Sequence, residues 1–187
     1  MSEIIRKTEG EKLKHQWVMV EDALRWAHRW AHKSLIKSPS VQRSSRSSDP
    51  HALTQLDNVA QATMILAFVQ RSLPEIDRDV ISLFFIPPGD ARKEFLAAYV
   101  GHRLHEQLNR PKWWVVDVLR DWSGARAHHQ VKWWCENLGQ SQPTLWRWAR
   151  GRDDRSVYTT IERDLAKAID SLHEPMVERK WIGEEKS

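Results

Sequence analysis

The sequence predicts an all-α protein, organised as a multi-helix domain. Apolar residues recur mostly at steps of three and four, which is the spacing of one face of an α-helix. Seven glycines and eight prolines are few for 187 residues, so long helical segments are left uninterrupted. The composition is 41% hydrophobic and 29% charged, which allows a core and does not indicate global disorder.

The longest apolar stripe lies in residues 11–36 and predicts a helix there. Two arrangements would bury this stripe: it packs on the chain's own core, or it pairs with a second copy in a homodimer. Residues 38–50 hold six serines and two prolines, and therefore predict a linker or loop between segments 1–37 and 51–110. The members of the stripe are Leu13, Trp17, Val20, Leu24, Ala27, Ala31 and Leu35.

Segment 51–110 predicts a helical core. A buried helix is expected over 51–72, with inward positions that include Ala60, Thr63 and Ile65. A second helix is expected over 73–86, because Pro74 suits a first turn and the run that follows is strongly apolar. A third runs from Asp90 to about Leu108, with Phe95, Leu96, Tyr99, Val100, Leu104 and Leu108 facing inward.

Segment 111–172 predicts a helix over 111–122, a pair of short helices over 131–150 and a closing helix over 157–172. Residues 173–187 are expected to form a tail or a short last helix. Two adjacent tryptophan pairs, Trp113–Trp114 and Trp133–Trp134, are expected to place one ring in the core and one beside it. No internal repeat is evident.

The pair of short helices has its own sequence signals. Val131, Trp134 and Leu138 recur at helical spacing and can line one apolar face. Gly139 ends this run, where a residue with positive φ closes a helix and turns the chain. Pro143 suits the first turn of the second helix, and Leu145 and Trp148 can face back onto the first.

This segment resembles a helix-turn-helix unit. Such units carry a small residue early in the first helix, a glycine four positions later and apolar residues in the second helix. Cys135, Gly139, Leu145 and Trp148 occupy those positions, with Cys where Ala is commoner. The resemblance implies that the second helix enters the major groove of double-stranded DNA. The alternative is a helical hairpin that only builds a core.

Each outward residue of this segment has an expected role in DNA binding. Arg147 and Arg150 would anchor on phosphates or guanines, while Gln142 and Thr144 would contact base edges. Trp146 would touch a thymine methyl or a sugar, or would pack against a flanking helix. The turn residues would hold the DNA backbone, and a basic side chain follows the second helix. The candidate site is Gln140, Ser141, Gln142, Thr144, Trp146, Arg147, Arg150 and Arg152.

The distribution of charge supports a polyanionic partner. Residues 110–155 hold nine Lys/Arg against five Asp/Glu, and residues 1–49 hold ten against six, so each carries a balance of +4. Residues 50–109 and 156–187 hold five against seven each. Basic charge gathered around the two short helices is the expected footprint of nucleic-acid binding, although a solvated basic face is the plainer alternative.

The sequence favours a protein without catalytic activity, metal or cofactor. It contains no phosphate-binding glycine loop, nucleophile elbow or HExxH motif. His102 and His105 are three apart, but no acid or thiol completes a metal shell around them. One cysteine excludes an intrachain disulfide. Since no apolar run approaches a membrane span, a cytoplasmic protein with no membrane partner is expected.

A second resemblance concerns residues 73–85, LPEIDRDVISLFF. This run resembles the entry helix of the DNA-binding region of sigma-type factors and of phage late-gene antiterminators of the Q type. The early WAHRW of residues 26–30 is similar to the tryptophan-rich N-termini of such phage proteins. In sigma factors the entry helix lies close to the helix-turn-helix, whereas some 45 residues separate the two here.

Together these patterns predict a sequence-specific DNA-binding transcription factor. The second resemblance implies a phage-type antiterminator that acts with RNA polymerase. Three alternatives stay open: an ordinary repressor or activator, a non-catalytic RNA-binding factor, and a protein-interaction adaptor.

Overall fold

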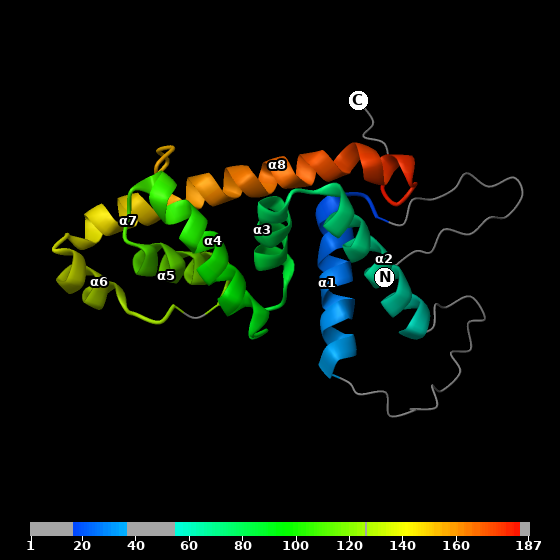
Figure 1. Cartoon of the computed structure of the whole chain (residues 1–187), viewed down its shortest axis with the longest axis horizontal. Coiled ribbons are helices and arrows are strands. Elements are labelled where there is room, and N and C mark those ends of the chain that lie inside the picture. The colour runs from blue at the N-terminus through cyan, green and yellow to red at the C-terminus, as the bar shows by residue number, and fades with distance from the viewer. Residues whose placement is uncertain (1–16, 37–54, 126, 184–187) are drawn as a thin grey trace, which may run out of the picture. The chain divides into compact units, whose positions relative to one another are not determined.

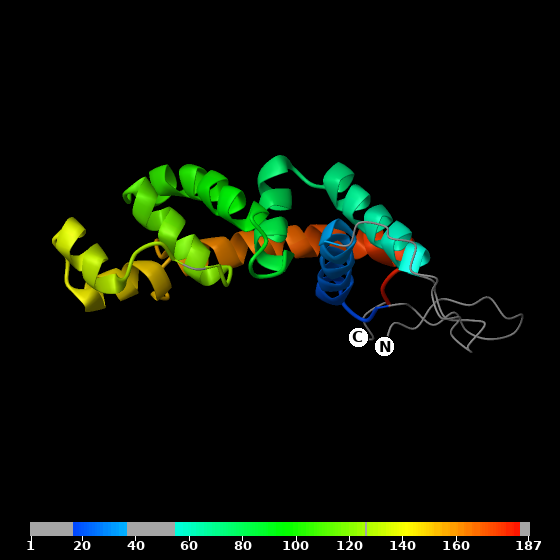
Figure 2. The same ribbon diagram turned by 90° about the horizontal axis from the view of Figure 1, so that it is seen from below.

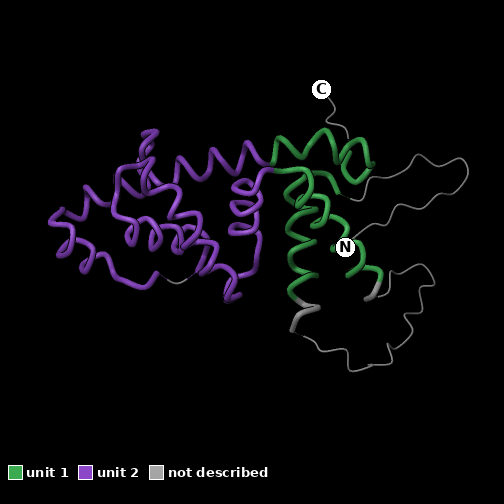
Figure 3. Tube along the Cα trace, in the orientation of Figure 1, with its two compact units in different colours: residues 1–73, 169–187 green, residues 74–168 purple. Residues whose placement is uncertain are grey.

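The computed structural model describes residues 17–36, 55–125 and 127–183. Within these residues the chain forms eight α-helices, and its only extended pairing is one isolated bridge (Figure 1). The predicted all-α class is therefore confirmed. The chain divides into two compact units, residues 1–73 with 169–187 and residues 74–168, and each is described by itself (Figure 3). The predicted linker over 38–50 lies outside the described residues.

In the first unit, α1 (Val20–Ile36) packs against α2 (Gln55–Ser72) (Figures 1 and 2). Ala23, Leu24 and Ala27 of the predicted stripe are fully buried. These three residues of the stripe thus pack within their own chain, as in the first of the two predicted arrangements.

The first helix starts later than predicted. It begins at Val20, and the residues before Trp17 lie outside the described part of the chain. Trp17 is not helical: it forms a parallel bridge with Ile182, and its N–H donates to the carbonyl of Trp181 at 3.1 Å. Because this backbone pairing uses the amide of Trp17, the helical hydrogen bonds begin after it.

The buried side of α2 differs from the prediction. Its buried side chains include Ala62, Ile65 and Val69, whereas Ala60 and Thr63 are exposed. Each residue advances the side-chain direction by about 100°, so a core centred on Ile65 turns these two positions outward.

The second unit begins with α3 (Glu75–Phe85), α4 (Arg92–Leu108) and α5 (Lys112–Trp122). The helices α3 and α4 pack together, as do α4 and α5. A Cβ at Gly101 of α4 would lie 2.6 Å from Cγ2 of Val116 on α5. Glycine at this position therefore permits the close approach of the two helices.

The expected inward face of α4 is partly wrong. Val100, Leu104 and Leu108 are buried as predicted, but Phe95 is 76% exposed and Tyr99 is 38% exposed. Lys93 takes the inward position in the first turn, and its Nζ donates to the carbonyl of Ser123 just after α5. This hydrogen bond satisfies a backbone carbonyl at the end of α5 that has no partner within the helix. Burial lowers the pKa of Lys93.

The second unit continues through α6 (Val131–Leu138) and α7 (Gln142–Arg150) into the first part of α8 (Val157–Glu178). The closing helix was predicted to end at Leu172, and it instead continues past Pro175. Leu172 and Met176 are four apart and both fully buried, so the apolar face extends beyond the proline.

Candidate nucleic-acid interface

The two short helices have the bounds expected from the sequence. The helix α6 ends at Leu138, α7 begins at Gln142, and residues 139–141 form the turn between them. Gly139 has φ 60° and ψ 28°, so the predicted positive φ is confirmed. The helices α6 and α7 pack on each other and form the yellow part of Figure 1.

The inner face of α7 is fixed by apolar and aromatic contacts. Leu145 is 1% exposed and Ala149 is 2% exposed, and both lie on the side that the spacing predicted for Leu145. Trp148 is half-buried, and its ring meets the fully buried ring of Trp114 edge-on at 6.1 Å. The guanidinium of Arg110 lies 4.0 Å from the centre of the Trp148 ring, a cation–π contact.

A buried carboxylate fixes the start of α6. Asp117 of α5 is 1% exposed, and its oxygens accept hydrogen bonds from the backbone N–H groups of His128 and His129 at 2.9 and 3.0 Å. The same carboxylate accepts from Nδ1 of His129 at 2.8 Å and from Nε1 of Trp134 at 3.1 Å. A carboxylate can only accept, so Nδ1 of His129 carries the proton.

The environment of Asp117 favours its ionised form. Burial by itself raises the pKa of the carboxyl, but the hydrogen bonds from His128, Trp134 and His129 outweigh it and hold the pKa below its ordinary value. The guanidinium of Arg120 lies 3.4 Å away and adds a favourable charge. Asp117 therefore ties α5 to the segment that starts α6, and no local sequence pattern had singled it out.

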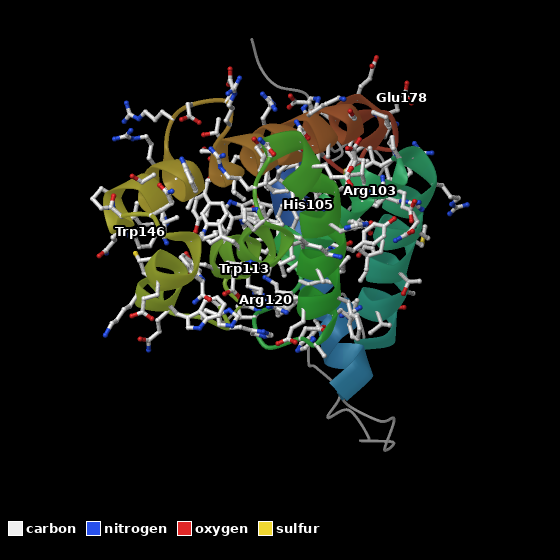
Figure 4. All side chains as sticks on the ribbon, turned by 60° about the vertical axis from the view of Figure 1, so that its left-hand side comes forward. Arg103, His105, Trp113, Arg120, Trp146 and Glu178 are labelled. Atoms are coloured by element: carbon white, nitrogen blue, oxygen red, sulfur yellow. The ribbon has the colours of Figure 1, made fainter. Side chains whose placement is uncertain are left out.

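The outer face of α7 is polar and basic. Gln142 and Arg147 are exposed, Thr144 and Trp146 are half-buried, and Arg152 is exposed just after the helix. Figure 4 labels Trp146 on this part of the second unit. The predicted site residues are thus spread around α7: Arg147 and Arg150 face outward, and Thr144 and Trp146 lie at the two edges of the inner face. Gln142 is exposed in the first turn.

The turn presents backbone donors beside that face. Gln140 is half-buried and Ser141 is exposed, and the hydroxyls of Ser141 and Thr144 lie 3.0 Å apart. No side-chain oxygen caps the first N–H groups of α7. Uncapped N–H groups at the positive end of a helix dipole are suited to a phosphate oxygen.

Arg150 is engaged within the protein. Its Nη2 donates to Oδ2 of Asp121 at 2.6 Å, and its guanidinium lies 4.5 Å from the centre of the Trp146 ring. Tyr158 of α8 donates to the same oxygen of Asp121 at 2.9 Å. Burial and then this hydrogen bond raise the pKa of Tyr158 to about 12. The sequence did not single out Asp121 or Tyr158, because Asp121 is 29 residues from Arg150 and 37 residues from Tyr158 along the chain.

The two tryptophan pairs meet each other in space. The tripeptide Lys-Trp-Trp occurs at 112–114 and again at 132–134. Trp114 meets Trp134 edge-on at 6.3 Å, and Trp113 meets Trp133 edge-on at 4.9 Å. Trp114 and Trp134 are buried, whereas Trp113 is half-buried and Trp133 is 37% exposed. This is the division into core ring and neighbouring ring that the sequence predicts.

The candidate metal pair of the sequence lies on α4. His102 and His105 stack with ring centres 5.5 Å apart. Across the described residues, no three His, Cys, Asp or Glu side chains are grouped so that they could hold a metal ion. Within the same part of the chain, no helix is both long and apolar enough to cross a membrane.

Comparison of the chain with protein-family models and with curated proteins gives no match.

Proposed function

We propose that the chain is a sequence-specific DNA-binding regulator of transcription that uses α7 as its recognition helix. The observation that carries this proposal is the two-sided character of α7. Leu145, Trp148 and Ala149 pack inward, while Arg147 is exposed on the opposite side and Gln142 is exposed in the first turn. A polar outer face is common to surface helices, so the proposal depends on the amide and guanidinium groups that this face presents.

The dimensions and chemistry of α7 fit a major groove. Nine residues span about 14 Å, and the groove is about 12 Å wide. Amide and guanidinium side chains are the groups that make paired hydrogen bonds to adenine and guanine edges. The uncapped N-terminus of α7 and the exposed Arg152 would hold phosphates on either side.

The structure separates the two arginines that the sequence treated alike. Arg147 is exposed and no described residue forms an ion pair with it, whereas Arg150 is paired with Asp121. Arg147 is therefore the better candidate for a base contact. Arg150 would fix the end of α7 against α5 and α8, and would reach DNA only by leaving Asp121.

The test is a binding selection on random duplexes, followed by a comparison of Arg147→Ala with Arg103→Ala. Arg103 is an exposed arginine of α4, so its replacement by alanine changes the net charge by the same amount. It lies apart from Trp146 in Figure 4 and therefore outside the proposed interface. Arg147→Ala should weaken binding to the selected site by about 1–3 kcal/mol and relax its specificity at one position. Equal affinities of the two variants would remove Arg147 from the interface.

Within this proposal, antitermination with RNA polymerase is the specific regulatory role that we infer from residues 73–85. That run contains the whole of α3, a helix of the same unit as α7. An ordinary repressor or activator would share the DNA-binding surface and would lack the effect on terminators.

A further inference from the structure

The repeated Lys-Trp-Trp tripeptides create a second surface beside the start of α6. The inner rings, Trp114 and Trp134, are 0% and 4% exposed and belong to the core. The outer rings, Trp113 and Trp133, lie where α5 and α6 begin, and Trp113 is labelled in Figure 4. A core needs only the inner pair, so the outer pair calls for a separate explanation.

Neighbouring rings cover only one face of the Trp133 ring. The His129 ring stacks on Trp133 with centres 3.8 Å apart and planes 14° apart. Trp113 is 4.9 Å from Trp133 and 6.1 Å from His129, so the three centres form nearly a right angle at Trp133. Trp113 therefore lies beside the stack, and the face of Trp133 opposite His129 meets neither ring.

The stack is also held rigidly. Nδ1 of His129 donates to the buried carboxylate of Asp117 at 2.8 Å, which fixes the plane of the imidazole. The Trp133 ring stacks on this imidazole with nearly parallel planes, so the hydrogen bond holds the surface against which Trp133 packs. A preformed aromatic face loses little conformational entropy when a flat ligand stacks on it.

The charges around this surface are basic. Lys112 and Lys132, each preceding a tryptophan pair, are exposed, and neither forms an ion pair with any residue in the described part of the chain. Of the two acids of α5, Asp117 is buried under its donors, which include His129, and Asp121 accepts from Arg150 and Tyr158. The carboxylate of Glu94 on α4 lies 3.9 Å from Nε2 of His128. Glu136, one turn after Lys132, is the only acid on α6.

We propose that Trp133, supported by His129 and Trp113, is a stacking site for an unpaired base of single-stranded nucleic acid. Lys112 and Lys132 would bind the neighbouring phosphates. An aromatic face next to unpaired cations is the combination that single-strand sites use, since every base has a π-face and every nucleotide brings a negative charge. A duplex hides its base faces, so this site is separate from the duplex contact proposed for α7 and does not depend on it.

The test measures binding of the full chain to fluorescent oligothymidine of about 12 nucleotides, a length typical of such sites. Trp133→Ala should weaken binding roughly 5- to 150-fold, the range found when one stacking aromatic is removed. Trp133→Phe should keep most of the affinity, because it keeps an aromatic face. Phe95→Ala, which removes an aromatic side chain that is 76% exposed on α4, should change nothing.

Two further measurements separate stacking from charge. An abasic strand of the same length keeps the phosphates and lacks the bases, so it should bind as weakly to the wild type as oligothymidine binds to Trp133→Ala. Lys112→Ala with Lys132→Ala should flatten the dependence of binding on salt. The proposal would be overturned if the wild type bound the abasic strand as tightly as oligothymidine. It would also be overturned if Trp133→Ala bound oligothymidine as tightly as the wild type does. The proposal would also be overturned if the full chain bound an acidic aromatic peptide and did not bind oligothymidine.

Duplex binding keeps this proposal distinct from the function proposed for α7. Trp133→Ala should leave affinity for the selected duplex unchanged while it lowers affinity for the single strand. Loss of both affinities together, with Trp133→Phe equally impaired, would show a general disturbance of α6 and would count against a stacking site.

Discussion

The indole N–H of Trp134 donates to the carboxylate of Asp117 at 3.1 Å, across 17 residues of sequence. This bond joins α5 to α6 in the interior of the second unit. We expect Asp117→Asn to lower the free energy of unfolding by about 1–3 kcal/mol, because a carboxamide cannot accept from all the donors that now face the carboxylate. Urea denaturation measures this, with Asp170→Asn at an exposed position of α8 as the control. Matching midpoints for the two variants would contradict the role given to Asp117.

The same substitution should change the dependence of stability on pH. The folded pKa of Asp117 lies below its ordinary value of 3.8. The unfolded chain therefore takes up this proton first as pH falls, and the stability from Asp117 is present above about pH 4 and lost as pH falls through the folded pKa. Asp79 and Asp164, whose pKa values burial raises, act in the opposite sense in both proteins. The difference between wild type and Asp117→Asn should hence shrink in acid.

The local parts of this region could be predicted from sequence, because they depend on neighbours along the chain. The apolar steps through Trp134 and Leu145 and the glycine at position 139 determine where the two short helices begin and end. The hydrogen bonds of Asp117 with His128 and of Arg150 with Asp121 could not be predicted, since they join residues 11 and 29 positions apart along the sequence. A charged residue gives no periodic signal that it is buried.

The error on α4 has a related cause. Hydrophobicity alone favours Phe95 over Lys93 for an inward position, because an amine costs more to bury than a ring. The open carbonyl of Ser123 reverses this preference, and Gly101 sets the rotation of the helix against Val116. Both influences come from α5 or just beyond it, so the sequence of α4 by itself cannot reveal them.

The turn at Gly139 allows a prediction that separates backbone strain from crowding. No atom lies within 4 Å of a Cβ placed on Gly139, so only its φ of 60° opposes a side chain. Gly139→Val should cost roughly 1 kcal/mol or more, and should weaken duplex binding by disturbing the angle between α6 and α7. Gly139→Asn should retain both properties, because asparagine tolerates this conformation. A stable Gly139→Val protein that binds normally would mean that the turn adapts without positive φ.

The two arginines of α7 should respond differently to alanine. Arg150→Ala removes the ion pair with Asp121 and the contacts with the rings of Trp146 and Tyr158. Because this pair is largely exposed, we expect a loss of no more than about 1 kcal/mol in stability, together with weaker duplex binding. Arg147→Ala should weaken duplex binding and leave stability unchanged. Thermal denaturation and duplex titration of both proteins check this, and identical stability in the two would show that the Arg150 contacts do not hold α7.

The last prediction concerns transcription, and it uses the division of the chain into two units. The proposed recognition helix α7 lies in the unit of residues 74–168, while α1 belongs to the other unit. Deleting residues 1–49 should therefore leave binding to the selected duplex intact, and it should abolish any effect on read-through of a terminator by purified RNA polymerase. The deletion also uncovers Ala62 and Ile65 of α2, which are fully buried in the whole chain. Arg25→Ala with Arg29→Ala, at exposed positions of α1, removes the surface charge while keeping the helix in place. If the truncated protein no longer binds DNA, α1 contributes to the fold that α7 requires. If the full chain binds its site and never alters read-through, antitermination is the wrong role, and a repressor or activator describes the protein better.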